Sequence, residues 1–318
     1  MRIAFILDPL DSLRTYKDSS YVMMRECAAR GHEVWELQQG DLAWANGRVM
    51  AHARHLRLTG DEADWYEITG ETESPLDGWD AVVMRKDPPF DMEYVFSTYL
   101  LELAEAQGAC VLNSPRAIRD HSEKLAIAQF AQFTAPTIVT RRESAIRAFH
   151  AEHGDIVVKP LDGMGGASVF RIRRDDFNLG VIIETLTAHG TRFAMAQRFI
   201  PEIVDGDKRV LVIGGKPVPY ALARIPMAGE NRGNLAAGGR GVAQPLAPRD
   251  REIAETLGPV LAARGLLLVG LDIIGEHLTE VNVTSPTCFR EIMDQTGCNV
   301  AALMIDAVEA AARARGSC

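Results

Sequence analysis

The chain has 318 residues, of which 47% are hydrophobic and 24% are charged, a composition typical of a folded globular protein. Its formal net charge is −9, from 34 basic and 43 acidic side chains, which disfavours general binding to nucleic acid. No apolar run approaches the roughly 20 residues of a membrane span, and the first apolar run is too short for a signal peptide. We therefore expect a cytoplasmic protein of two or three lobes, without nucleic-acid or membrane partners.

The cysteines indicate the same compartment. They are odd in number and form no CxxC pair, so we expect free thiols in a reducing environment rather than a disulfide framework. They are Cys27, Cys110, Cys288, Cys298 and Cys318.

The first part of the chain alternates strand and helix patterns, which predicts an α/β lobe. Gly31 is a plausible helix stop within it. No GxGxxG follows the first strand, so a Rossmann dinucleotide site is not expected. Gly40–Gly78 has no clean period and is expected to mix loop and strand. The expected strands are Arg2–Leu7, His32–Leu37, Ala81–Met84 and Cys110–Asn113, and the expected helices are Ser20–Arg30 and Met92–Ala106.

After about residue 120, short strands and helices interleave, which predicts an α+β arrangement with antiparallel pairs. The expected strands are Ile138–Thr140, Asp155–Lys159, Ser168–Arg173, Ala194–Phe199, Arg209–Ile213 and Val218–Arg224. The expected helices are Ser122–Phe133, Ser144–Glu152, Leu179–Ala188, Asp250–Ala263 and Cys298–Ala312. A stretch with five glycines, Ile225–Gly241, is expected to be either a lid or disordered.

A polar cluster is predicted at a hairpin near the end of the chain. Leu266–Ile274 is almost wholly apolar but contains Asp272, and the next short run carries Glu280 and Asn282. If Ile274 pairs with Leu278, Asp272 falls opposite Glu280, and Asn282 points to the same face. Facing carboxylates repel unless a cation lies between them, and these oxygen donors suit Mg²⁺. The alternative is a hairpin with a solvated polar face.

A second candidate site follows another predicted strand. Lys159 ends that strand, and the turn Gly163–Gly166 comes next, where glycines let backbone N–H groups approach phosphate oxygens. The P-loop pattern GxxxxGK[ST] is absent. Lys124 offers a second cation upstream. The alternatives are an ordinary hairpin turn and a solvated lysine in the first turn of a helix.

Several other polar residues adjoin apolar strands. Arg209 and Arg224 need an anion, which is either a structural carboxylate or a substrate. Ser285 and Thr287 follow the hairpin directly and suit a carboxylate ligand, although an ordinary turn is the alternative. Cys288 has no His–Asp partner pattern and is interpreted as a packing residue.

Four longer segments add a more specific pattern: Val83–Phe90, Lys159–Gly166, Arg232–Gly241 and Leu278–Thr287. Together they resemble the bacterial glutathione synthetase family of the ATP-grasp superfamily. The resemblance spans effectively the whole chain and is weakest over Gly40–Gly78. It implies the ATP-grasp fold, with an N-terminal α/β domain (1–121), a central lid lobe (122–200) and a C-terminal catalytic lobe (201–318) that carries a glycine-rich lid loop (225–241).

The resemblance also implies roles for individual residues. ATP would be bound by Lys124, Lys159, Gly163, Met164, Gly165, Gly166, Gln197, Arg198, Phe199, Ile200 and Asp207. Mg²⁺ or Mn²⁺ would be bound by Asp272, Glu280 and Asn282. Catalytic charge neutralisation would come from Arg209, Arg224, Arg232 and Arg240. The peptide substrate would contact Arg85, Arg209, Arg224, Gly239, Ser285 and Thr287.

The implied reaction is the ATP-dependent ligation of γ-glutamylcysteine and glycine to glutathione, through an acyl phosphate, with release of ADP and phosphate. The substrate carboxylate is the nucleophile in this reaction, which agrees with the lack of a Ser/His or Cys/His constellation. The resemblance further implies a homotetramer.

Two other functions remain open at this point. One is a different ATP-grasp ligase, such as a D-alanine–D-alanine or glutamate-adding enzyme. The other is a catalytically silent ATP-binding protein of the synapsin-like kind, for which we would expect loss of metal ligands or lid arginines.

Overall fold

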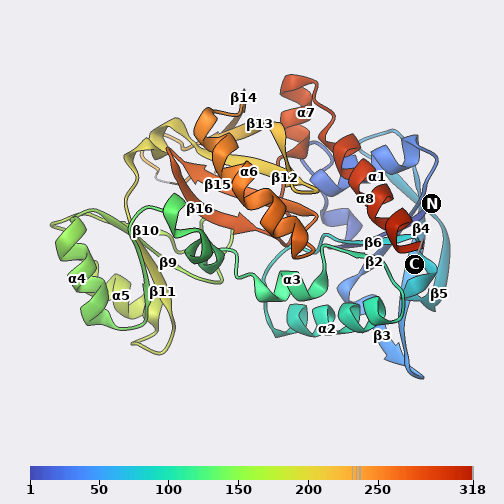
Figure 1. Ribbon diagram of the computed structural model, residues 1–318, viewed down its shortest axis with the longest axis horizontal. Helices are drawn as coiled ribbons and strands as arrows, with labels where there is room; N and C mark the ends of the chain where they lie inside the picture. The colour runs from blue at the N-terminus through green and yellow to red at the C-terminus, as the bar shows by residue number, and fades with distance from the viewer. Residues whose placement is uncertain (231, 234, 236–237, 317–318) are drawn as a thin grey trace.

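The computed structural model describes residues 1–230, 232–233, 235 and 238–316, which form three β-sheets with helices packed against them (Figure 1). The sheets follow one another along the chain and have seven, four and five strands. The four-stranded sheet lies at one end of the long axis and the seven-stranded sheet at the other, with the five-stranded sheet between them. An α/β part is thus followed by an α+β part, as predicted.

The seven-stranded sheet is parallel at one side and antiparallel at the other. Its strands pair in the order β3-β4-β2-β1-β6-β7, with β5 on β4, and only β2, β1, β6 and β7 run parallel among them. Their bounds are β1 Arg2–Leu7, β2 Glu33–Gln38, β3 Leu42–Ala45, β4 Arg48–Leu58, β5 Tyr66–Pro75, β6 Ala81–Met84 and β7 Val111–Leu112.

Both faces of this sheet are covered by helices. Ala4 and Ile6 of β1 belong to the same core cluster as residues of α2 (Met92–Ala106). Ile3 and Phe5 belong to a second cluster with residues of α1 (Ser19–Ala29) and α8 (Val300–Gly316). Because side chains alternate along a strand, a strand buried on both faces reads as a continuous apolar run.

The stretch Gly40–Gly78, which shows no clean hydrophobic period, contains three strands, β3 to β5. Two 3₁₀ turns, Gln39–Asp41 and Leu76–Gly78, lie at its two ends. β5 is half-buried or exposed along its whole length. Such a strand carries no apolar alternation, because neither of its faces is buried in a core.

The four-stranded sheet is antiparallel and has the order β10-β9-β11-β8. Helices α4 (Glu143–His153) and α5 (Leu179–Thr187) share a small core with it. The helix predicted over Ser122–Phe133 is instead a 3₁₀ segment, Leu125–Phe133, with non-helical dihedrals at Phe130. The strands are β8 Thr137–Thr140, β9 Ile156–Pro160, β10 Phe170–Ile172 and β11 Ala194–Arg198.

The five-stranded sheet is also antiparallel and has the order β14-β13-β12-β15-β16. Residues of α6 (Pro248–Ala263) share one core cluster with it, and residues of α7 (Phe289–Thr296) and α8 share the other. The strands are β12 Asp207–Ile213, β13 Lys216–Ile225, β14 Arg240–Pro245, β15 Leu268–Ile274 and β16 His277–Asn282.

Three elements were not predicted: α7, β14 and the six-residue helix α3 (Pro115–Asp120). All three are short, and short elements give little periodic signal. A remaining 3₁₀ turn lies at Leu10–Ser12 and another at Pro201–Asp205.

The β15–β16 hairpin has the predicted pair but a different turn. Asp272 lies opposite Glu280, as expected, yet Ile274 pairs with His277 and Ile273 with Leu278. The register shifts between Asp272 and Ile273, so the expected Ile274–Leu278 pair was wrong. A two-residue turn with a bulge therefore gives the same carboxylate pairing that a three-residue loop would give.

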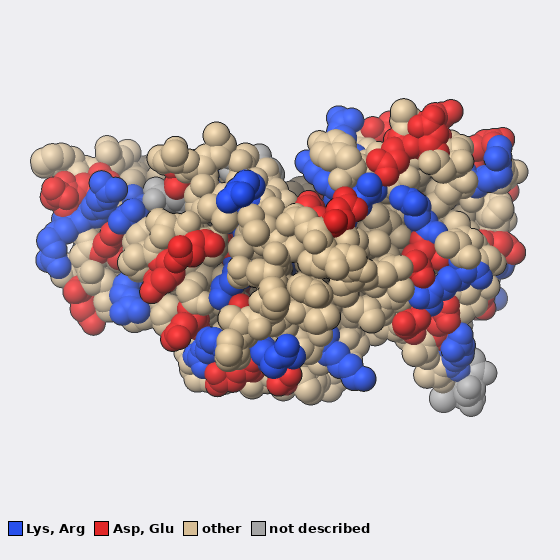
Figure 2. All heavy atoms as spheres, turned by 90° about the horizontal axis from the view of Figure 1, so that it is seen from above, with Lys and Arg blue, Asp and Glu red and all other residues tan. Residues whose placement is uncertain are grey.

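In the described part of the chain, Cys27, Cys110, Cys288 and Cys298 are free, which confirms the predicted thiols; Cys318 lies outside it. No described helix is long and apolar enough to cross a membrane. On the face shown in Figure 2, Lys and Arg side chains are interspersed with Asp and Glu instead of forming one continuous basic patch.

A buried amide joins the first sheet to the third. The Asn113 side chain donates to the carbonyls of Leu268 (2.8 Å) and Val283 (2.9 Å), and it accepts from the Leu268 N–H (2.8 Å). The Ser114 N–H donates to the Gly265 carbonyl at 2.9 Å beside it. These bonds fix the end of β7 against the strands that carry Asp272 and Asn282.

We predict that Asn113→Ala lowers the free energy of unfolding by about 2–4 kcal/mol, because buried backbone groups of β15 and of the Val283 segment lose their partners. Urea denaturation monitored by circular dichroism measures this change. Asn178→Ala is the matched control, since Asn178 is exposed and its side chain caps no helix. Equal stability of the two variants would contradict the proposed role of the amide.

Candidate active site

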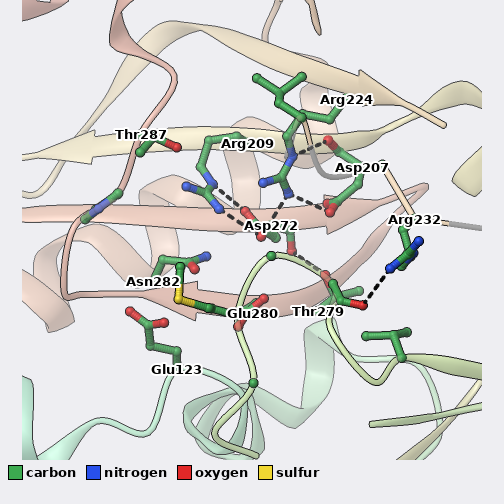
Figure 3. Close-up of a pocket in the computed structure, with 18 of the residues that line it drawn as sticks. Glu123, Asp207, Arg209, Arg224, Arg232, Asp272, Thr279, Glu280, Asn282 and Thr287 are labelled. Carbon is green, nitrogen blue, oxygen red and sulfur yellow. Dashed lines mark hydrogen bonds and ion pairs between the residues drawn. The ribbon is translucent and has the colours of Figure 1, made fainter. Parts of the chain in front are cut away.

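A cavity of about 510 Å³ lies where the three sheets meet, and residues of all three parts of the chain line it. Figure 3 shows its centre, where charged side chains from β12, β13, β15 and β16 point toward one another. Among the predicted site residues, the cavity is lined by Lys124, Lys159, Gly163 to Gly166, Gln197 to Ile200, Asp207, Arg209, Arg224, Arg232, Asp272, Glu280, Asn282, Ser285 and Thr287.

The centre of the site is a buried cluster of two arginines and two aspartates. Arg209 Nε lies 2.5 Å from Asp272 Oδ1, and Arg209 Nη2 lies 3.1 Å from Oδ2. Arg224 Nη2 lies 2.9 Å from Asp272 Oδ2 and 2.5 Å from Asp207 Oδ2. Asp272 is only 2% exposed, so its charge depends on these two guanidinium groups.

Sheet register explains why these four side chains meet. Arg209 lies opposite Asp272 on the neighbouring strand, and Arg224 lies opposite Asp207. Residues 207 and 209 of β12 point to the same face because side chains alternate along a strand. Gly270 leaves room for the ion pair, since a Cβ there would lie 2.9 Å from Arg209 Cδ.

The cluster changes the titration of both carboxyl groups. Burial opposes ionisation of Asp272, but Arg209 and Arg224 outweigh it and hold its pKa well below the usual range. Burial raises the pKa of Asp207 to about 6 despite the nearby Arg224. The buried Oδ1 of Asp207 has no hydrogen-bond partner among the described residues, so it is available to accept a bond from a ligand hydroxyl.

The three predicted metal ligands share one face of the β15–β16 hairpin. Glu280 Oε1 accepts from Lys124 Nζ at 3.0 Å, and Asn282 Nδ2 donates to the Gly270 carbonyl at 3.1 Å. Both carboxylates, Asp272 and Glu280, are thus paired with basic side chains. Within the described residues there is no group of three or more His, Cys, Asp or Glu side chains that could hold a metal ion. The predicted metal ligands are instead two carboxylates and one amide oxygen, which are hard ligands of the kind that divalent Mg²⁺ accepts.

Lys159 is the strongest candidate for a residue that binds an anion. It is 8% exposed, and its Nζ lies 3.4 Å from the Thr279 carbonyl. Burial lowers the pKa of Lys159 below its ordinary value. A buried ammonium with one weak acceptor gains most from a bound anion.

The glycine turn lies beside both lysines. Gly165 and Gly166 have positive φ angles, +61° and +80°, that side chains rarely adopt. Lys124 donates to the Gly163 carbonyl, and Arg232 of the lid loop donates to the Gly166 carbonyl at 3.5 Å. The turn and the lid loop thus lie next to each other over the cavity. The described part of the lid loop excludes residues 231, 234, 236 and 237.

The segment Gln197–Ile200 forms another wall of the cavity. The Gln197 side chain is buried and donates to the Thr137 hydroxyl at 2.9 Å. The N–H groups of Arg198 and Phe199 donate to the carbonyls of Pro136 and Asp155, both at 2.9 Å. These two N–H groups are therefore engaged in hydrogen bonds within the protein and are not free to bind a ligand in this structure.

Three predicted site residues do not line the cavity: Arg85, Gly239 and Arg240. Arg85 is buried, and its Nε donates to the Ser20 hydroxyl at 3.0 Å. Arg240 begins β14 and is exposed.

The sequence did not single out Glu123, which also lines the cavity. Its Oε1 accepts from the N–H groups of Val283 (2.8 Å) and Thr284 (3.1 Å) and from the Thr284 hydroxyl (2.9 Å). This carboxylate holds the segment that leads from Asn282 to Ser285. In the sequence it looks like an ordinary acid near a helix start, so no local signal marks it.

Another missed feature is Gly233 in the lid loop. A Cβ there would lie 2.2 Å from the Arg224 carbonyl and 3.1 Å from Asp207 Cβ. Only a glycine lets the loop lie this close to the ion cluster.

Comparison with known proteins agrees with this geometry. The family model described as prokaryotic glutathione synthetase, N-terminal domain, matches residues 1–119, and that described as prokaryotic glutathione synthetase, ATP-grasp domain, matches residues 123–297. The chain is 66% identical over 313 residues to glutathione synthetase of Nitrosomonas europaea, covering 97% of this chain and 98% of that protein. It is 52% identical to glutathione synthetase of Shewanella oneidensis, covering 97% and 98%.

Solved structures show the same fold at low identity. D-cycloserine synthetase DcsG superposes with a TM-score of 0.66 at 16% identity, covering 98% of this chain and 99% of that one. The ATP-grasp ligase PsnB, complexed with a precursor peptide and AMPPNP, gives 0.62 at 21% identity, covering 98% of each chain. The fold is therefore ATP-grasp, and the chain belongs to the prokaryotic glutathione synthetase family.

Proposed function

We propose that the protein joins γ-glutamylcysteine to glycine with ATP as co-substrate, forming glutathione, ADP and phosphate. Membership of the glutathione synthetase family supports the reaction. The main structural observation in support is that one cavity is lined both by Lys159 and the glycine turn and by Arg209, Asp272 and Glu280. The last three lie opposite one another on adjacent strands. The groups proposed to bind phosphate and those proposed to bind the substrate carboxylate would thus share one space.

ATP would lie between the four-stranded and five-stranded sheets. Lys124 and Lys159 would neutralise its phosphates, with the turn Gly163–Gly166 closing over them. The adenine would lie against Gln197–Ile200. Asp207 would accept a bond from a ribose hydroxyl through its unpartnered Oδ1.

The ATP-grasp family implies a divalent metal, and we propose Mg²⁺ or Mn²⁺ bound by Asp272, Glu280 and Asn282. When bound, such an ion offsets the negative charge of the phosphates. In the structure, Arg209 and Arg224 pair with Asp272, and Lys124 pairs with Glu280.

The chemistry needs no protein nucleophile. An oxygen of the cysteinyl carboxylate would attack the γ-phosphorus of ATP, giving an acyl phosphate and ADP. The glycine amine would then attack the acyl carbon, form the peptide bond and lose a proton as phosphate leaves. The arginines would stabilise the developing charge; they are Arg209 and Arg224 in the cluster and Arg232 and Arg240 on the lid loop.

The peptide would bind beside the ion cluster. Ser285 and Thr287 line the cavity directly after β16, and Ser285 donates to Asp87 in this structure. Arg85 and Gly239 are proposed as further contacts once the lid has closed. Closure would exclude water, which otherwise hydrolyses the acyl phosphate.

We also propose that the protein acts as a homotetramer in the cytoplasm. The free cysteines suit a reducing compartment. Met92, Phe96, Tyr99 and Leu103 of α2 are 48–59% exposed and recur at helical spacing along one stripe, which provides an apolar face for association.

The decisive experiment is a coupled ADP-release assay over a panel of acids and amines. We expect turnover with γ-glutamylcysteine plus glycine, and at least tenfold lower turnover with D-alanine pairs or with glutamate as the added amine. Strong release with D-alanine alone would favour a different ATP-grasp ligase. ATP binding without turnover on any substrate would favour a silent ATP-binding protein.

We predict that Glu280→Ala reduces kcat by about 100- to 1000-fold, because removing a charge-stabilising group from the phosphoryl site costs about 3–4 kcal/mol of transition-state stabilisation. Steady-state kinetics with saturating Mg²⁺ measures this loss. Glu276→Ala is the matched control, since Glu276 is exposed in the same hairpin and does not line the cavity. Near-normal turnover of Glu280→Ala would refute its assignment as a metal ligand.

We predict that ATP affinity falls as pH rises through the lowered pKa of Lys159. Burial disfavours its ammonium form in the free protein, whereas ATP phosphates favour it, so binding takes up a proton at high pH. Calorimetric titration with ATP from pH 7 to 10 measures the slope of log affinity against pH. Lys159→Arg should flatten it, because arginine stays charged, and Lys216→Arg at an exposed position is the control. An equal slope in all three proteins would exclude Lys159 as the phosphate ligand.

A further inference from the structure

One part of the cavity is lined by charges that have no role in the reaction proposed above: Arg14, Lys17, Asp18 and Glu291. Arg14, Lys17 and Asp18 lie in the segment that leads into α1, and Glu291 belongs to α7. The Phe289 N–H donates to the Ser19 hydroxyl at 3.2 Å, so the start of α1 meets the start of α7. Asp18 precedes α1, and Glu291 lies in the first turn of α7.

These four side chains differ from the ion cluster at the centre of the cavity. Within the described residues, none of them makes an ion pair, whereas Arg209, Arg224, Arg232, Asp272 and Glu280 all do. Asp18 uses Oδ1 to accept from the Tyr21 N–H at 2.7 Å. The Oε2 atom of Glu291 is buried and has no hydrogen-bond partner.

Two carboxylates in this position favour a cationic ligand. Burial raises the pKa of both Asp18 and Glu291, so an ionised form of either gains from a counter-charge. Two carboxylates are few ligands for Mg²⁺ or Ca²⁺, which take six or more oxygen ligands. An ammonium group needs fewer acceptors and fits better.

The neighbouring basic side chains, Arg14 and Lys17, place a second requirement on the ligand. Lys17 is close enough to Glu291 to affect its titration without forming an ion pair with it. Arg14 and Lys17 are exposed on the same stretch of chain. A ligand that offers an ammonium to the acids and a carboxylate to the bases would satisfy both pairs together.

Resting on the function proposed above, we propose that Asp18 and Glu291 bind the α-ammonium of the γ-glutamyl group and that Arg14 and Lys17 bind its α-carboxylate. In γ-glutamylcysteine both charges sit on one carbon, because the peptide bond uses the side-chain carboxyl. In α-glutamylcysteine the α-carboxyl is consumed by the peptide bond. This subsite therefore selects the γ-linked dipeptide over the α-linked one.

The test compares γ-glutamylcysteine with glutarylcysteine, which lacks the ammonium, and with 4-aminobutyrylcysteine, which lacks the α-carboxylate. The variants are Asp18→Asn, Glu291→Gln and Lys17→Met. Asp18→Asn keeps an oxygen that can cap α1. Asp294→Asn is the matched control, because Asp294 lies on the same helix, is exposed and does not line the cavity.

We expect each acid variant to lower kcat/KM for γ-glutamylcysteine by roughly 10- to 100-fold, the usual effect of losing a charged hydrogen bond. The same variants should leave kcat/KM for glutarylcysteine and KM for ATP unchanged. Lys17→Met should lower kcat/KM for γ-glutamylcysteine but not for 4-aminobutyrylcysteine. Asp294→Asn should behave as the unmodified protein.

Equal losses on γ-glutamylcysteine and glutarylcysteine, or no loss on either, would overturn the proposed subsite. Failure of the unmodified protein to release ADP with γ-glutamylcysteine and glycine would instead overturn the function on which the subsite rests. The two failures are thus separate results of one set of assays.

Discussion

The site depends on the ion cluster that Asp207, Arg209, Arg224 and Asp272 form inside the five-stranded sheet. A carboxylate that is 2% exposed is stable only when its charge is compensated. Removing one partner of such a pair typically costs about 3–5 kcal/mol, because the other charge is left buried alone. The cluster therefore fixes the strands of this sheet and, with them, the position of every charged group at the centre of the cavity.

The cluster also dictates what its neighbours can be. Gly270 leaves space for the Arg209 side chain, and Gly233 lets the lid loop approach the backbone of Arg224. Glu123 holds the segment after β16, and Asn113 ties β15 and the segment after β16 to the first sheet. Each of these residues helps to place another residue of the site.

Sequence reasoning succeeded where the signal was local. The apolar runs predicted most strands, and the placement of Asp272 opposite Glu280 was confirmed. The reasoning failed where the signal was distant in the chain. It did not identify the basic side chains that pair with these carboxylates, which are Arg209 on β12 and Lys124 before η4 (Leu125–Phe133). No spacing rule around residues 272–282 encodes those partners.

The sequence by itself determined the family, the order of most strands and helices, and most of the residues around the cavity, because these depend on motifs and short-range periodicity. Tertiary structure alone decided that buried Arg85 contacts Ser20 instead of lining the cavity, that Glu123 holds the segment after Asn282, and that the start of α1 meets the start of α7. Those relations join residues far apart in the chain, and only packing of the three sheets brings them together. The hairpin with Asp272 and Glu280 shows both cases. Its strand pairing follows from neighbouring residues, whereas the basic side chains that balance its carboxylates come from distant parts of the chain.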